Sequence, residues 1–386
     1  MAKFSECFFC PAPWTSMYHY NGNTTPCHAI NNENAFSPND YLNSEWLTNI
    51  KQDMISGIVP KSCVSCKSRE DAGLKSTRGA FWRYYNVGPK PEIDTSLYTL
   101  DNKTALSRIE IRTTNLCNFK CRMCSATFSS EIAREENHFS ISSNSMTKNI
   151  CTSPESHIME LKNLCFNDVS SICLTGGEPF LIKEYCDFMD FLIDNDLNKK
   201  ITIELFTNCS VYNTKFIDRL LKFKLVKFNM SIDGIGKTAE YQRHGTNWSI
   251  VRENILKFNL LPFEIWVNTA ISSYVLLDVS SLAKFLMELY TINNKILPKC
   301  YSVGKNLGLH HSFMNADLRK MAINEINQAV EILTPDNFEI LTTELNNIKL
   351  NLENTEPIDS LKFKLFTKTL DAMRQESFKD VFGYNL

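Results

Sequence analysis

The chain of 386 residues lacks any apolar run that approaches the roughly 18 residues of a membrane-spanning helix. Its first residues, MAKFSECFFCPAPW, lack the basic region and apolar stretch of a secretory signal peptide. It also lacks an excess of charge of one sign, because its formal net charge at pH 7 is −2. A nearly neutral chain has no global field to attract nucleic acid or an anionic membrane. We therefore expect a cytoplasmic protein with neither as a partner.

Cysteine, in contrast, is abundant, with 14 copies. In a large chain without an export signal, many cysteines indicate metal or redox chemistry rather than disulfides. Six of them occur singly, and we expect these to be small buried apolar residues. The others form an N-terminal group and a tight triplet: Cys7, Cys10, Cys27, Cys63 and Cys66, then Cys117, Cys121 and Cys124.

The pattern of the chain changes near residue 105. Residues 1–95 are rich in Cys, Pro, Asn and Gly, and GPKPE at 88–92 is typical of a linker. Beyond them, short alternating apolar segments are separated by amphipathic helical ones, as in repeated strand–helix units. Residues 136–160 are polar and predicted to be an excursion, and 316–386 are predicted to be helical. The predicted strands are 107–113, 170–175, 201–208, 226–232 and 264–271, with a sixth near 298–304.

Within these strands one parity is apolar and the other is polar. Glu110, Arg112, Glu204, Ser231 and Asn268 share the polar parity. Parallel strands buried on both faces are normally apolar throughout, so one face of this sheet should line a polar space. We expect a partial barrel whose interior is a reaction chamber. An open sheet with one solvated face is the alternative.

The triplet has the spacing C-x3-C-x2-C and follows the first predicted strand of the barrel. Three thiolates can each bind one iron of a cubane cluster and leave the fourth iron open for a small molecule. A structural zinc site would need a fourth ligand nearby, and the loop contains none. The sequence therefore predicts an open cluster on Cys117, Cys121 and Cys124.

The loop TTNLCNFKCRMCSA resembles the signature of the radical S-adenosylmethionine (SAM) superfamily. That family has an aromatic residue before the third cysteine, where this chain has Met123, whose thioether can still pack on adenine. The resemblance spans roughly 105–315 and implies an α/β fold, a partial (β/α)6 TIM-like barrel. The matching positions at successive strand ends are Gly176, Gly177 and Glu178, then Asn208, Ser231, Asp233, Arg243 and Asn268.

The resemblance also implies what these positions bind. The Gly-Gly-Glu segment would contact the SAM amino group, and the Ser231–Asp233 segment the ribose and carboxylate. Arg243 would pair with the same carboxylate. The family's chemistry is reductive cleavage of SAM, chelated to the open iron of a [4Fe-4S] cluster, to a 5′-deoxyadenosyl radical that abstracts a hydrogen atom. It requires an external electron donor such as flavodoxin or ferredoxin.

The N-terminal cysteines resemble the opening of SPASM and twitch modules, which hold auxiliary iron–sulfur clusters. The segments CPAPW and GNTTPC match best, and Cys10, Cys27, Cys63 and Cys66 would be the ligands. One auxiliary cluster, most simply [4Fe-4S], is expected. A four-cysteine zinc knuckle is the alternative, and Cys7 could replace Cys10. We expect a SPASM/twitch-like module at 1–95, a radical SAM core at 100–315 and a helical C-terminal extension at 316–386.

Auxiliary clusters of this kind commonly accompany modification of peptides, so a peptide or protein side chain is the expected substrate. The same chemistry on a sugar or nucleoside is the second hypothesis. No winged-helix domain that would bind a leader peptide is visible in the first ninety residues, which weakens the first hypothesis without removing it. A non-catalytic iron–sulfur electron carrier is the third, and the intact triplet with its Gly-Gly-Glu segment argues against it.

Overall fold

The computed structural model describes residues 2–3, 7–30, 36–73, 75–85, 92–100, 105–139, 154–305 and 308–386. Its main feature is an eight-stranded sheet with the order β12-β11-β9-β8-β7-β5-β2-β3. All neighbours are parallel except β2 and β3. The strands are β2 (Ser16–Tyr20), β3 (Asn23–Thr25), β5 (Arg108–Arg112), β7 (Ser171–Leu174), β8 (Thr202–Thr207), β9 (Leu225–Ser231), β11 (Glu264–Ile271) and β12 (Leu297–Ser302).

Six of these strands, β5, β7, β8, β9, β11 and β12, are those predicted from the sequence, with ends that differ by at most two residues. No pairing among the described residues joins β12 to β3, so the sheet is an incomplete barrel. The predicted α/β fold is confirmed. The sequence did not predict that β2 and β3, from the cysteine-rich N-terminal part, extend the same sheet beyond β5.

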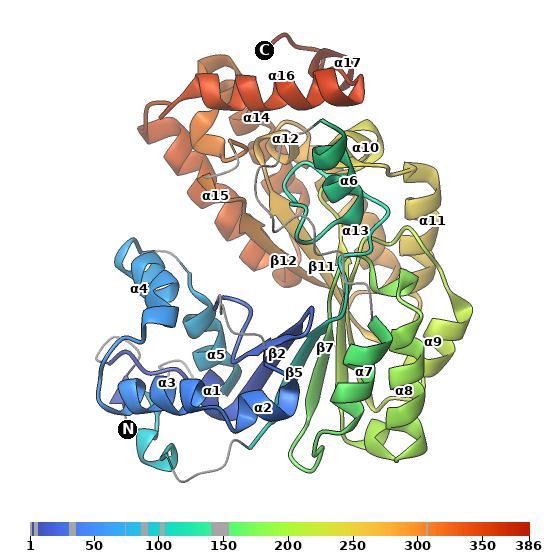
Figure 1. The fold of residues 1–386 in the computed structure, drawn as a ribbon. Helices are drawn as coiled ribbons and strands as arrows, with labels where there is room; N and C mark the ends of the chain where they lie inside the picture. The colour runs from blue at the N-terminus through green and yellow to red at the C-terminus, as the bar shows by residue number, and fades with distance from the viewer. Residues whose placement is uncertain are drawn as a thin grey trace.

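Helices cover the outer, apolar face of the sheet (Figure 1). These helices are α7 (Pro154–Lys162), α8 (Glu184–Asp194), α9 (Thr214–Leu220), α10 (Gly236–Gln242), α11 (Trp248–Asn259), α12 (Ser273–Leu276) and α13 (Val279–Ile292). Among the described helices none combines the length and hydropathy needed to cross a membrane.

The N-terminal part carries α1 (Ala12–Thr15), α2 (Pro38–Leu42), α3 (Glu45–Ile55), α4 (Val64–Asp71) and α5 (Thr77–Tyr85). It has a separate small apolar core around Trp14 and Trp82. Its short strand β1 (Ala2–Lys3) pairs with β4 (Glu92–Ile93). The predicted linker 88–92 lies outside the described residues except for Glu92, which belongs to β4.

The C-terminal part is helical, as expected from the sequence. It forms α14 (Ala316–Ile332), α15 (Glu339–Asn354), α16 (Ser360–Arg374) and α17 (Phe378–Phe382), at the top of Figure 1. Residues 136–160 were predicted to be an irregular excursion between two strand–helix units. This prediction is wrong at both ends of the segment, where α6 (Ser130–His138) and α7 are helical. Helix α7 forms there because Ile158 and Leu161 are buried against the sheet. Residues 140–153 lie outside the described residues.

The single cysteines divide into three classes. Cys173 and Cys209 are buried, as predicted, and Cys186 and Cys300 are half-buried. Cys165 is exposed, so the prediction is wrong there. Cys151 lies outside the described residues.

Candidate active site

The three cysteines of the triplet lie on the loop that follows β5, at the carboxyl end of the parallel strands. The loop is held by a two-residue strand, β6 (Lys120–Cys121), which pairs antiparallel with β10 (Arg243–His244). A pocket of about 150 Å³ opens here. It is lined by the triplet together with Phe119, Phe128, Ser129, Thr175, Gly176, Gly177, Phe206, Thr207, Asn208, Ser231 and Arg243.

Most of the predicted cofactor residues therefore meet at one place, although they come from the ends of three strands and from β10. Gly176 and Gly177 follow β7, Asn208 follows β8, and Ser231 ends β9. Asn208 lies beside the cysteine loop, with its amide Nδ2 3.0 Å from the Asn118 Oδ1 that it donates to and 4.0 Å from the Cys117 Sγ.

Four predicted residues do not line this pocket. Met123 packs partly buried against the main core. Asn268 donates from its amide to Asn229 Oδ1 at 3.1 Å. Glu178 and Asp233 are both buried just behind the pocket wall and contact residues that line it.

Glu178 connects the ends of β7 and β8. Its carboxylate accepts hydrogen bonds from Thr207 Oγ1 at 2.8 Å, from the Asn208 backbone N–H at 2.7 Å and from the Phe180 N–H at 3.3 Å. Burial raises the pKa of Glu178 to about 7, against the opposing effect of these bonds. Since both oxygens are already bonded within the protein, this side chain positions Thr207 and Asn208 at the pocket.

Arg243 supplies positive charge beside the triplet. Its Nη1 lies 3.8 Å from the Cys121 Sγ, and its Nη2 is 2.5 Å from Asp233 Oδ2. Burial raises the pKa of the Cys121 thiol, and the guanidinium acts against that rise. Burial also raises the pKa of Cys117 and of Cys124 to about 12. With pKa values raised in this way, the free cysteines favour the protonated thiol. They would lose the proton and become thiolates when a metal binds them.

The spacing of the thiols bears on the kind of metal centre that they could bind. Tetrahedral zinc with Zn–S bonds of about 2.3 Å would hold its sulfur atoms roughly 3.8 Å apart. Among the described residues, no three cysteine Sγ atoms lie within 4.8 Å of one another. A cubane holds each thiolate on a different iron and so keeps them further apart. Three thiolates that can each bind a different iron are the ligand set of an open iron–sulfur cluster.

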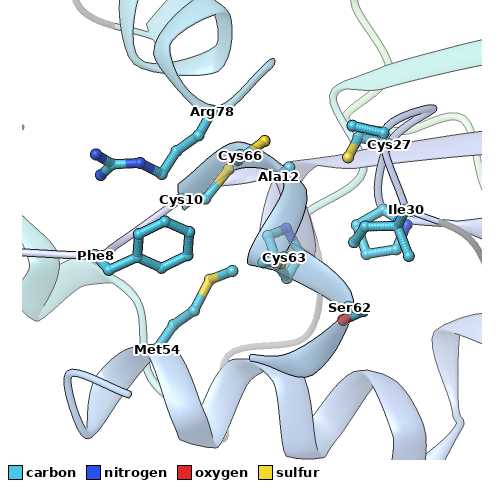
Figure 2. Close-up of a pocket in the computed structure, with 13 residues that line it drawn as sticks. Phe8, Cys10, Ala12, Cys27, Ile30, Met54, Ser62, Cys63, Cys66 and Arg78 are labelled. Atoms are coloured by element: carbon cyan, nitrogen blue, oxygen red, sulfur yellow. The ribbon is translucent and has the colours of Figure 1, made fainter. Parts of the chain in front are cut away.

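The N-terminal cysteines form a second site. Cys10, Cys27, Cys63 and Cys66 are all buried and line one small enclosed pocket, which Figure 2 shows with Phe8, Met54 and Ile30 around it. Cys7 does not line the pocket. Four cysteines with an apolar surround fit a fully ligated cluster.

Sequence reasoning missed a charged network that holds the triplet loop from behind. Arg122, between the second and third cysteines, has a side chain with 0% exposure. Its Nη2 contacts Asp371 Oδ1 at 2.7 Å and Glu376 Oε2 at 2.5 Å, and its guanidinium lies 3.6 Å from the Tyr241 ring centroid. Glu376 also contacts His244 at 2.7 Å. Helix α16 and the turn after it thus fix the loop.

Replacing Arg122 with methionine should destabilise this loop. The change leaves Asp371 and Glu376 without their guanidinium, and breaking a buried ion pair costs about 3 kcal/mol at the low end of the usual range. Urea unfolding measures the loss, and the iron content of the reconstituted variant should fall with it. Arg134→Met is the control, because Arg134 is 62% exposed and an exposed ion pair contributes about 0–1 kcal/mol. Equal stabilities of the two variants would contradict this role.

A second cavity lies on the inner face of the sheet, nearer the amino ends of the strands. It measures about 300 Å³ and is walled on one side by the N-terminal part. Its charges are largely paired: Arg108 with Glu204 at 3.1 Å and His28 with Glu110 at 3.3 Å. The lining residues are His28, Thr77, Ala80, Phe81, Arg108, Glu110, Glu204, Lys227, Trp266 and Lys299. The expectation that the polar strand parity lines a chamber is thereby confirmed.

The family model for the radical SAM superfamily matches residues 111–271, from β5 to the end of β11. No curated protein matches the chain.

Among solved structures, histidine-tagged anSMEcpe with bound AdoMet is similar to this chain, with a TM-score of 0.42 and 16% identity over 63% of this chain and 60% of that one. Streptococcus suis SuiB bound to precursor peptide SuiA has a TM-score of 0.36 and 14% identity over 74% of this chain and 60% of that one. The match thus spans 60% of the length of either structure.

The matched segment contains the triplet, the Gly-Gly-Glu turn and every strand end that forms the pocket. The family implies a [4Fe-4S] cluster that binds SAM. The pocket suits this group, because three cysteines lie in it and part of its wall is the backbone of two glycines. Residues 111–271, which form the pocket, are therefore similar to the radical SAM superfamily.

Proposed function

We propose that this chain cleaves SAM reductively at a [4Fe-4S] cluster on Cys117, Cys121 and Cys124 and abstracts a hydrogen atom from a peptide or protein side chain. When bound and reduced, the cluster would supply the electron that breaks a sulfonium C–S bond of SAM, which gives methionine and a 5′-deoxyadenosyl radical. The observation that carries the proposal is the single pocket that joins three cysteines to Gly176, Gly177 and Arg243.

The pocket walls suggest how the chain would orient SAM. The backbone of Gly176 and Gly177, free of side chains, allows the SAM amino group to approach the cluster closely. Arg243 would pair with the SAM carboxylate, while its ion pair with Asp233 keeps the guanidinium in place. Asn208 and Ser231 offer hydrogen-bonding groups to the ribose. Phe119, Phe128 and Phe206 help to exclude water from the reacting atoms.

The substrate would lie between the two cavities. Glu204 lines the charged cavity, and Phe206, two residues further along β8, lines the cysteine pocket. Two residues of a strand span about 7 Å and point to the same face. A substrate seated on Glu204, Lys227 and Lys299 would therefore reach the cysteine pocket through the space next to Phe206, which is 36% exposed.

The character of the charged cavity favours a peptide. It presents carboxylates, ammonium groups and the aromatic rings of Trp266 and Phe81 along one face. Such a surface offers partners to amide N–H groups, carbonyls and side chains of either charge. A small polar molecule such as a sugar or nucleoside is the second candidate, since about 300 Å³ lies at the lower end of ligand pockets. Deuterium transfer from labelled peptide, but not from labelled nucleoside, into 5′-deoxyadenosine would favour the peptide.

We propose that the four N-terminal cysteines hold an auxiliary [4Fe-4S] cluster that relays electrons. Helix α5 separates the two sites: Arg78 lines the four-cysteine pocket, and Thr77, Ala80 and Phe81 line the charged cavity. A helix with its side chains is about 10–12 Å across. A cluster there would be near the substrate without touching it, which supports electron transfer rather than substrate ligation. The external donor would be flavodoxin or ferredoxin.

Replacing Cys121 with alanine tests the central proposal. Anaerobically reconstituted wild-type protein with dithionite should convert SAM to 5′-deoxyadenosine and methionine. The Cys121→Ala variant should show no turnover above background, because two cysteines cannot retain the cluster. Cys165→Ala is the matched control, since Cys165 is exposed and lies outside the site, and it should retain full activity. Unchanged turnover in Cys121→Ala would rule out the mechanism.

A further inference from the structure

Two histidines and a glutamate from distant parts of the chain meet on the outer face of the sheet. His19 lies on β2, and His157 and Glu160 lie one helical turn apart on α7. One ligand atom from each lies within 4.8 Å of the other two. His19 pairs in register with Ile111 of β5, and the side chain of Ile111 is on the face of the sheet that the helices cover, not on the barrel interior. The group is therefore separate from both cysteine sites.

The distance between the two imidazoles suits a shared metal ion. His19 Nε2 lies 3.4 Å from His157 Nδ1, and the rings are inclined at 60°. A direct N–H···N hydrogen bond at this distance would be long, since such bonds are normally about 2.9–3.0 Å. Two nitrogens bound to one tetrahedral zinc, with Zn–N bonds of about 2.0–2.1 Å, would lie roughly 3.4 Å apart.

The surroundings of His19 are also those of a metal ligand. Its side chain is fully buried, and its Nδ1 lies 2.9 Å from Thr24 Oγ1. With Nδ1 protonated and donating to that hydroxyl, Nε2 carries the lone pair and faces His157. Metal-binding histidines are normally held by such a second hydrogen bond.

Glu160 supplies the negative charge. Its Oε2 is buried, and it has no hydrogen-bond partner among the residues that the structure describes. A buried carboxylate oxygen without a partner is costly unless a cation or donor binds it. Gly22 makes room for the group, because a Cβ at that position would lie 3.0 Å from His157 Cε1.

We propose that His19, His157 and Glu160 bind one divalent cation of the zinc class, with a water in the fourth position. Two imidazoles and one carboxylate are a ligand set that zinc accepts. The ion would join β2, which the N-terminal part contributes to the sheet, to α7, which leads into β7. Its role would be to clamp the four-cysteine part against the edge of the radical SAM domain.

To test this site, the full chain is reconstituted anaerobically and dialysed first against zinc and then against buffer. Its metal content is then measured. We expect about one zinc per chain, and X-ray absorption at the zinc edge should show nitrogen and oxygen neighbours at about 2.0–2.1 Å without sulfur. His157→Gln should lose this zinc, whereas His138→Gln, on the exposed end of α6, should keep it. The iron content of each variant reports whether the protein still folds and holds its clusters.

Thr24→Val provides a second, milder variant, because it removes only the hydrogen bond to His19. Its zinc affinity should fall about tenfold or more, as for other losses of a group that orients a ligand. Sulfur neighbours around the zinc, equal zinc in wild type and His157→Gln, or no zinc retained by wild type would each overturn the proposal.

Discussion

Gly177→Ala is expected to lower SAM cleavage by at least about 100-fold. A Cβ at this position would lie 2.0 Å from the Leu116 carbonyl oxygen, 2.3 Å from the Leu116 carbonyl carbon and 2.7 Å from the Asn115 carbonyl oxygen. All three are backbone atoms, so no side chain can rotate to make room. Leu116 immediately precedes Cys117, and the loop must move by an ångström or more. Misplacement of that size in an active site costs about 100-fold.

Gly57→Ala is the control for this substitution. Gly57 has a φ of +74°, so alanine there is strained by about 1–2 kcal/mol, but its Cβ would meet no atom within 4 Å. This variant should cleave SAM at the wild-type rate. The measurement is 5′-deoxyadenosine formed per chain at equal iron content. A Gly177→Ala protein within a few-fold of wild type would show that the close approach of the two backbones does not position the cluster or SAM.

Cys63→Ala is expected to halve the iron of the reconstituted protein, from about eight atoms per chain to about four, because one of two cubanes is lost. Cleavage of SAM should persist, since the triplet is intact. Conversion of the substrate should stop if the auxiliary cluster accepts the electron that the substrate radical gives up. Iron analysis measures the loss of the auxiliary cluster, and the yield of 5′-deoxyadenosine measures whether SAM is still cleaved.

Cys7→Ala is the matched control, because Cys7 does not line the four-cysteine pocket. It should retain about eight irons. Wild-type protein with about four irons and a zinc bound by sulfur would contradict the auxiliary cluster. Loss of iron on Cys7→Ala would instead make Cys7 a ligand in place of Cys10.

The parts of the site that could be predicted from sequence are those encoded by local patterns. The close spacing of Cys117, Cys121 and Cys124 in one loop is enough to predict that they bind one cluster. The alternation of apolar and polar residues along the strands identifies the inner face of the sheet. Gly176, Asn208 and Ser231 lie at consecutive strand ends, and parallel strands bring these ends to one edge of the sheet. These residues could therefore be assigned to one site without knowledge of the order of the strands in the sheet.

Contacts between residues far apart in sequence could not be predicted in this way. Arg122 meets Asp371 across 249 positions, and no periodicity relates a cysteine loop to the last turn of a C-terminal helix. Glu178 was expected at the cofactor, yet its oxygens are bonded to the end of β8. His19 and His157 lie 138 positions apart, and only the addition of β2 to the edge of the sheet brings them together.

The central claim is that three thiolates leave one iron of the triplet cluster free to chelate SAM. Pulsed ENDOR spectroscopy of the reduced Cys63→Ala protein, which should hold only this cluster, tests it with SAM labelled at the amino nitrogen and carboxylate oxygen. We predict hyperfine coupling of both labels to the cluster. No coupling in protein that contains the cluster, or zinc in place of iron at the triplet, would contradict the account.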